Sequence, residues 1–286
     1  MTLSLREQFS NHLFFKRYSP KTHEAYLGAV NGLALHYMKS PDQISDCDIQ
    51  SYLTSLLKEK KLAWSTCNVI FSGLVCFYSH FLKRPETGYR IPPRPRIKKI
   101  PMILSCEEVE NLFGSLSNLK HYALLLTIYS AGLRVSEAVN LKPIHIESDP
   151  SRMLIRVEQG KGRRDRYTIL SNRLVTVLRD CWLKYQPAEW VFFGQDRSKP
   201  MPIATAQRIY YNAKKRSGTT KGRGIHTLRH CFASHLMWKG TDIPTIKKLL
   251  GHSSIKTTYT YLHVTQAQID KVVSPLELLD IQGGRR

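Results

Sequence analysis

Apolar residues recur every three to four positions through the first 84 residues, which is the spacing of one helix face. The pattern predicts four helices: residues 4–16, a second from Ser19-Pro20 onward, residues 44–60, and a fourth from Ser65-Thr66 onward. The fourth helix is expected to bury a stripe formed by Val69, Ile70, Leu74, Phe77, Tyr78 and Phe81. Residues 1–84 are therefore predicted to form a small helical domain.

Proline dominates the next segment. Residues 85–101 read PETGYRIPPRPRIKKIP and hold five prolines, through which no helix can run. The segment is also basic. We interpret it as a stiff, extended linker that suits a path along a phosphate backbone, with a merely solvated linker as the alternative.

A second pattern, over residues 102–286, mixes helical and alternating periods. Ser105-x-x-Glu108 predicts a capped helix, and the strongly apolar residues 119–130 predict a buried central one. Residues 153–157 and 166–170 alternate on either side of a glycine-rich basic tip, which predicts a β-hairpin. We also expect a short strand at 190–193 and helices at 204–216, 226–238, 243–250 and 254–261. The whole chain is thus predicted to be mainly α-helical with a small β-sheet.

The composition excludes several classes of protein. Apolar residues make up 42% of the 286-residue chain, and the longest apolar stretch, residues 122–133, is shorter than the ~20 residues of a membrane span. The first residues lack the apolar run of a signal peptide, so we expect a cytoplasmic, nucleoid-associated protein. The six cysteines are widely spaced without a C-x-x-C pair, which argues against a zinc module or a disulfide framework.

The charge points to a polyanionic partner. Lys and Arg number 43 against 22 Asp and Glu, a net charge of +21, for which nucleic acid is the usual partner and a generally basic surface the alternative. The cations that we expect to contact DNA are Arg17, Lys21, Arg94, Arg96, Lys98, Lys99, Arg163 and Arg164.

Four local motifs carry side chains suited to phosphate chemistry. They are AGLRVSE at 131–137, the Lys161 tip between two glycines, HTLRH at 226–230, and LGHSSIKTTYTY at 250–261. Each alone has a simpler explanation, such as a surface ion pair or a solvated turn lysine. His226 and His230 have metal-ligand spacing, but no carboxylate stands near them, so no metal is expected. Together the motifs fit metal-free phosphoryl transfer, in which fixed Arg and His donors stabilise the phosphorane and a tyrosine attacks.

The combined set resembles the tyrosine recombinase (phage integrase) family, of the short Xer-like or mobile-element type, over almost the whole chain. The resemblance implies a SAM-like core-binding domain at 1–84, a linker at 85–101 and a catalytic domain at 102–286. It implies that Arg134 and Arg229 grip the phosphate and that Lys161 protonates the leaving 5′-oxygen. It further implies that His226 and His252 assist, that Glu137 supports them, and that Tyr261, nine residues after His252, is the nucleophile. Tyr259 is then not the nucleophile.

This resemblance implies an enzyme that cleaves and rejoins double-stranded DNA through a 3′-phosphotyrosine, without metal, ATP or another cofactor. It also implies a homotetramer on synapsed DNA, with the tail at residues 272–279 packed on a neighbouring subunit. The alternatives are a non-catalytic, recombinase-like accessory protein, and a topoisomerase or telomere resolvase with the same chemistry. The DNA site, and the choice between integration, excision and resolution, are not readable from the sequence.

Overall fold

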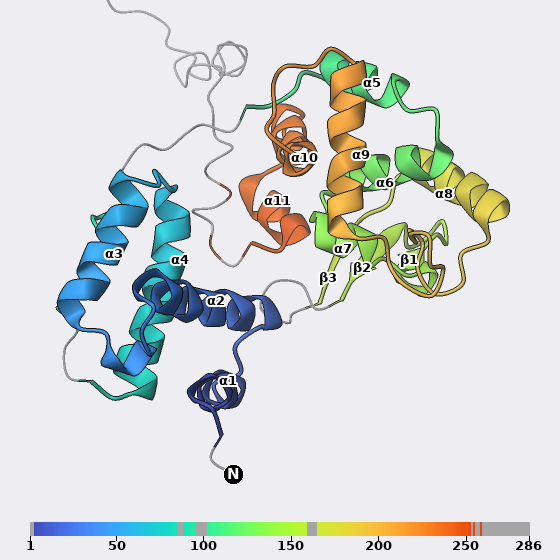
Figure 1. Cartoon of the computed structure of the whole chain (residues 1–286). Helices are drawn as coiled ribbons and strands as arrows, with labels where there is room; N and C mark the ends of the chain where they lie inside the picture. The colour runs from blue at the N-terminus through green and yellow to red at the C-terminus, as the bar shows by residue number, and fades with distance from the viewer. Residues whose placement is uncertain are drawn as a thin grey trace, which may run out of the picture. The chain divides into compact units, whose positions relative to one another are not determined.

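The computed structural model describes residues 3–84, 88–94, 102–158, 165–252, 254 and 258. The chain divides into two compact units, Met1–Lys98 and Lys99–Arg286, which are described separately (Figure 1). Helices predominate and one small sheet accompanies them, so the predicted fold class is confirmed. Within the described ranges, no helix is long and apolar enough to cross a membrane.

The first unit is helical in its described part. Its elements are α1 (Leu5–Phe15), α2 (Pro20–Tyr37), η1 (Pro41–Gln43), α3 (Asp46–Lys58), α4 (Trp64–Val75) and the π-helical turn η2 (Cys76–Phe81). Ser4, Ser19 and Ser45 cap the first three α-helices by accepting backbone N–H bonds. The caps explain why the sequence located these helix starts within two residues.

The core of this unit contains the apolar residues that the helical spacing selected, with one exception. Leu33, Leu53 and Leu74 are completely buried, but Val69 is 44% exposed, so its predicted inward position is wrong. Five residues before Leu74, Val69 lies about 140° further round α4 at ~100° per residue. It lies at the edge of the contact with α2, where it lines an open groove with Ala25 and Ala29.

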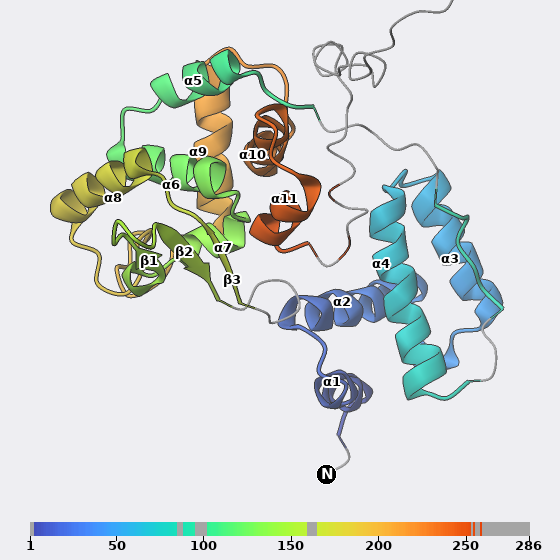
Figure 2. The same ribbon diagram turned by 180° about the vertical axis from the view of Figure 1, so that it is seen from behind.

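The second unit surrounds the buried helix α6 (Leu119–Ala131). Helices α8 (Asn172–Tyr185), α9 (Ile203–Arg216) and α10 (His226–Trp238) pack on it, as Figure 2 shows from behind. The remaining helices are α5 (Cys106–Gly114), α7 (Val135–Val139), η3 (Pro143–His145) and α11 (Ile243–Leu250). Strands β1 (Ile146–Glu147), β2 (Leu154–Val157) and β3 (Arg166–Ile169) form an antiparallel sheet in the order β1-β2-β3.

Three features of this unit depart from the sequence prediction. No strand forms at 190–193, where the described chain makes only a single bridge between Phe193 and Pro200. Phe192 is buried in the core although it lies in a loop. Its apolar character therefore reflects packing in the core and not a strand. Strand β1 and helix α8 were not predicted, although α8 buries Leu174, Val175, Leu178 and Cys181 at helical spacing.

Gly132 ends α6 in a conformation and a space that suit glycine alone. Its φ is +61°, and a Cβ there would lie 2.4 Å from Cδ1 of Phe232. We expect Gly132→Ala to lower the free energy of unfolding by about 2–5 kcal/mol, since the left-handed backbone costs ~1–2 and overpacking ~1–3 kcal/mol. Chemical denaturation measures the loss. Gly114→Ala is the matched control, because no atom lies within 4 Å of its Cβ, and an equal loss there would contradict the explanation.

Candidate active site

The turn after α6 places Arg134 and Glu137 together. Arg134 is the extended residue that precedes α7, with φ −70° and ψ 152°. Its backbone N–H donates to Oε2 of Glu137 over 2.7 Å, and its Nη1 donates to Oε1 over 2.6 Å. The Glu137 side chain is only 8% exposed and that of Arg134 22%. The pair is therefore not the solvated surface ion pair that the motif alone also allowed.

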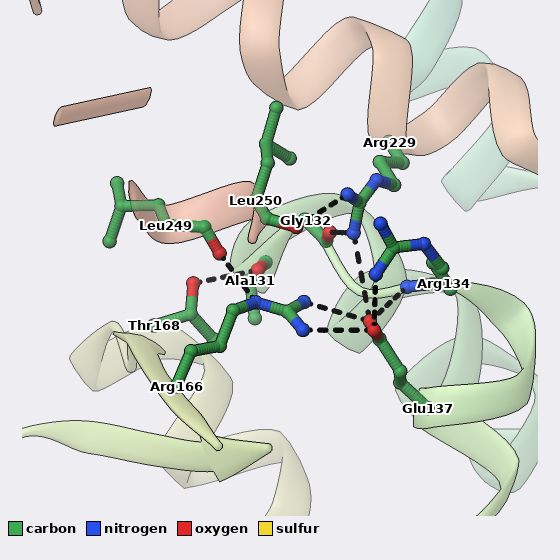
Figure 3. A network of polar contacts seen from close by, with 9 residues as sticks. All are labelled: Ala131, Gly132, Arg134, Glu137, Arg166, Thr168, Arg229, Leu249 and Leu250. Carbon is green, nitrogen blue, oxygen red and sulfur yellow. Dashed lines mark hydrogen bonds and ion pairs between the residues drawn. The ribbon is translucent and has the colours of Figure 1, made fainter. Parts of the chain in front are cut away.

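Arg229 reaches the same carboxylate from α10. Its Nη1 donates to the carbonyl oxygen of Gly132 over 2.7 Å, and its Nη2 donates to that of Leu250 over 2.6 Å. Nη1 also lies 3.6 Å from Oε2 of Glu137 (Figure 3). This buried arginine thus connects the C-terminal ends of α6 and α11 to the start of α7. The structure brings together the two arginines that the sequence selected.

Arg166, the first residue of β3, is a third guanidinium that the sequence analysis did not select. Its Nη1 and Nη2 donate to Oε1 and Oε2 of Glu137, each over 2.8 Å, and its Nε donates to the carbonyl oxygen of Leu249 over 2.9 Å. Alternation in the sequence could not have found it, because the polar Arg166 and Thr168 face inward on β3 whereas the apolar Tyr167 and Ile169 are exposed. A cation on the inner face of a strand needs a partner.

The carboxylate of Glu137 remains ionised in this setting. Burial alone would raise its pKa, but the hydrogen bonds and charge of Arg166, followed by those of Arg134, lower it to about 2. Three guanidinium groups then meet one carboxylate, and 3 − 1 leaves a charge of +2 in the network of Figure 3. Such an excess of fixed donors over acceptors suits a bound phosphate.

Two of the predicted histidines lie beside the arginines. His226 is the first residue of α10, and His252 follows Gly251, the left-handed residue that ends α11. Burial lowers the pKa of both imidazoles, and the charges of Arg229 and Arg134 lower it further, to about 4 for His252. Nδ1 of His252 lies 3.0 Å from Oγ1 of the buried Thr258. Both rings are neutral at pH 7 and so each can donate one N–H.

The lowered histidine pKa values predict that acid destabilises the fold well before carboxylates titrate. Burial also lowers the pKa of His230 to about 4, whereas an unfolded histidine binds a proton near 6.5. The unfolded state therefore binds more protons between pH 6.5 and 4, and stability falls as the pH is lowered through that window. Chemical denaturation at pH 7 and pH 5 measures the fall. The double variant His230→Gln/His252→Gln should lose less stability between pH 7 and pH 5, whereas His36→Gln, at an exposed position, should lose as much as the unmodified protein. Equal losses in both variants would contradict the assignment of the effect to the buried histidines.

Several predicted residues lie outside this cluster. Lys161, Tyr259, Tyr261, Arg96, Lys98, Lys99, Arg163 and Arg164 fall outside the described residues. Arg17, Lys21 and Arg94 belong to the first unit and are exposed, with the Arg94 guanidinium 5.9 Å from the centre of the Trp64 ring. Among the described residues, no group of three or more His, Cys, Asp or Glu side chains could hold a metal ion.

Known proteins match the chain along most of its length. The phage integrase family matches residues 103–268, and the phage integrase N-terminal SAM-like domain matches residues 5–87. A putative integrase/recombinase, y4qK of Sinorhizobium fredii, is 40% identical over 96% of this chain and 89% of its own. A tyrosine recombinase of Thermosipho africanus is 32% identical over 93% and 97%, respectively.

Solved structures agree with these relatives. XerA recombinase is 26% identical, with a TM-score of 0.54 over 94% of this chain and 96% of its own. A lambda integrase tetramer bound to a Holliday junction shares the fold at 18% identity, with a TM-score of 0.73 over 90% of this chain and 76% of its own. The two arginines, two histidines and one carboxylate of the cluster come from the motifs that resemble this family. The chain belongs to the phage integrase family of tyrosine recombinases.

Proposed function

We propose that this protein is a site-specific DNA recombinase that cleaves and rejoins DNA strands through a 3′-phosphotyrosine intermediate. The observation that carries the proposal is the convergence of Arg134 and Arg229 on the buried Glu137, beside the neutral His226 and His252. This cluster offers fixed donors to a phosphodiester. The names of the related integrases and recombinases support the same reaction.

The cluster would act on the non-bridging phosphate oxygens. Negative charge builds up on these oxygens when phosphorus becomes pentavalent, and preorganised donors stabilise that charge. Arg134 and Arg229 supply guanidinium donors, and His226 and His252 supply neutral N–H donors. Glu137 bonds to Arg134, lies 3.6 Å from Arg229 and itself stays ionised, because its pKa is about 2.

Tyr261 would be the nucleophile and Lys161 the general acid. The phenolic oxygen of Tyr261 loses its proton to water and bonds to phosphorus, while the bond from phosphorus to the 5′-oxygen breaks and Lys161 gives that oxygen a proton. The 5′-hydroxyl of a partner strand then reverses the step. Each cleavage exchanges one phosphate ester for another, so the reaction needs no ATP.

The partner would be double-stranded DNA held by a homotetramer. The +21 charge supports DNA binding, and the tetramer on a Holliday junction formed by lambda integrase supports the assembly. Two rounds of exchange through a four-way junction would recombine two duplexes, for DNA integration, excision or resolution. Residues 1–84 would bind DNA, residues 85–101 would link the domains, and the tail at 272–279 would contact a neighbouring subunit. Acting on cellular DNA, the protein would be cytoplasmic and associated with the nucleoid.

Covalent capture tests the proposal. The protein is incubated with randomly nicked genomic DNA fragments of its source, on which cleavage next to a nick releases a short strand and traps the enzyme. Fragments that survive a denaturing wash are sequenced, and we expect them to share one site. Tight binding without any denaturant-resistant fragment would instead identify a non-catalytic accessory protein.

The basic linker predicts a change in the salt dependence of binding. Neutralising Arg94, Arg96, Lys98 and Lys99 together should weaken binding to all DNA sequences alike. It should reduce the slope of log K against log salt by up to about four, since each lost phosphate contact removes about 0.9. Titration by fluorescence anisotropy measures the slope. Neutralising Arg173, Arg179 and Lys184, exposed on α8, is the control, and an unchanged slope in the linker variant would show that the segment only connects.

A further inference from the structure

The guanidinium of Arg166 bonds to both carboxylate oxygens of Glu137, whereas the guanidinium of each arginine assigned to the phosphate meets only one of them. It forms two parallel bonds of 2.8 Å, one to each oxygen, in a side chain that is only 9% exposed. The Arg134 guanidinium donates to Oε1 through one nitrogen, the Arg134 backbone N–H donates to Oε2, and Arg229 stands 3.6 Å from Oε2. Two-point pairing of this kind is the strongest geometry that a guanidinium and a carboxylate can form.

Arg166 is also fixed along the rest of its side chain. Its Nε bonds to the carbonyl oxygen of Leu249, and its Cδ lies where a Cβ on Gly251 would come within 2.7 Å. Gly251 directly precedes His252. One side chain therefore joins three elements, namely β3, the start of α7 and the end of α11 (Figure 3).

We propose that Arg166 is a positioning residue that neutralises Glu137, so that Arg134 and Arg229 are held side by side without committing their N–H donors to the carboxylate. This role rests on the proposed function and adds to it a residue that does not touch the phosphate. Without Arg166, a buried carboxylate would keep only two guanidinium partners, and these are the two that phosphate requires. Glu137 would then compete with the DNA for both.

Neutralisation of Glu137 by Arg166 predicts an unusual order of activities. Arg166→Met keeps an unbranched side chain and removes the charge, so cleavage should slow by about 10- to 100-fold, the range of coupling between contacting groups. Adding Glu137→Gln removes the competing charge as well. The double variant Arg166→Met/Glu137→Gln should therefore cleave faster than Arg166→Met alone. Arg166→Lys, which keeps the charge but not the two-point geometry, should fall between Arg166→Met and the unmodified protein.

A purely structural role predicts the opposite order. Each substitution would then remove a further buried bond, and the double variant would be the slowest and the least stable. Arg156→Met is the matched control, since Arg156 lies on the neighbouring strand β2 and pairs with Glu158 rather than with Glu137. It should cleave at the unmodified rate. Melting curves of every variant show whether loss of folding contributes.

Two readouts separate this inference from the proposed function. The first is the single-turnover rate of adduct formation on the captured nicked duplex. The second is the rise in Tm that inorganic phosphate causes, which needs no catalysis. We expect both the rate and the rise in Tm to be largest for the unmodified protein, smaller for the double variant and smallest for Arg166→Met. The role of Arg166 would be overturned if the double variant had a lower rate and a smaller rise in Tm than Arg166→Met. It would also be overturned if Arg166→Met matched the control variant in both. If the unmodified protein forms no adduct, the proposed function fails, and the phosphate order alone decides the inference.

Discussion

Tyr261→Phe is expected to bind the captured duplex with unchanged affinity and to form no covalent adduct. The substitution keeps the ring and removes only the oxygen that would attack phosphorus. The loss should be complete, because no other step can form the intermediate. Gel electrophoresis under denaturing conditions measures the adduct, and a mobility shift under native conditions measures the binding.

Tyr259→Phe is the matched control for this result. Residues 259 and 261 are two apart, and on a helix they would point about 200° from each other, so that only one can face a given phosphate. The resemblance to the family implies Tyr261, nine residues after His252, and the bare sequence does not choose between the two. The Tyr259→Phe variant should keep its adduct. An adduct that persists in Tyr261→Phe would overturn the assignment of the nucleophile.

Lys161→Ala is expected to slow strand cleavage by about 100- to 10,000-fold and to leave DNA binding nearly intact, since this is the range that a general acid contributes. Replacing the 5′-bridging oxygen of the DNA by sulfur gives a leaving group that needs no proton. That substrate should restore the rate of the variant while changing the unmodified protein little.

The sulfur substrate also distinguishes two roles of the lysine. If Lys161 only positions the phosphate, the variant stays slow on both substrates, and that result would remove the general acid from the mechanism. Lys199→Ala serves as the control, because Lys199 is exposed and pairs with Asp196 away from the arginine cluster. It should cleave both substrates at the unmodified rate.

Local signals explain why much of the fold could be predicted from the sequence. Helices α10 and α11 begin and end at the predicted residues, and Gly251 supplies the left-handed residue that ends α11. The contact between Arg134 and Glu137 follows from a separation of three residues. Such features depend on neighbours along the chain, which a sequence displays directly.

The organisation of the site depends on contacts that the sequence does not display. Arg166 meets Glu137 across 29 residues, and Arg229 meets the carbonyl oxygen of Gly132 across 97. Periodicity marks a face as buried, but it does not say which buried groups meet. The motifs therefore identified Arg134 and Arg229, whereas the role of Glu137 as the common partner of three arginines required the fold.

The chemical identity of the covalent link decides whether Tyr261 is the nucleophile. The unmodified protein is trapped on the captured nicked duplex, digested with trypsin and nuclease, and analysed by fragmentation mass spectrometry. We expect a nucleotide attached through its 3′-phosphate to Tyr261, within the tryptic peptide of residues 257–271. A nucleotide linked through its 5′-phosphate, or carried by Tyr259 or any other side chain, would contradict this assignment.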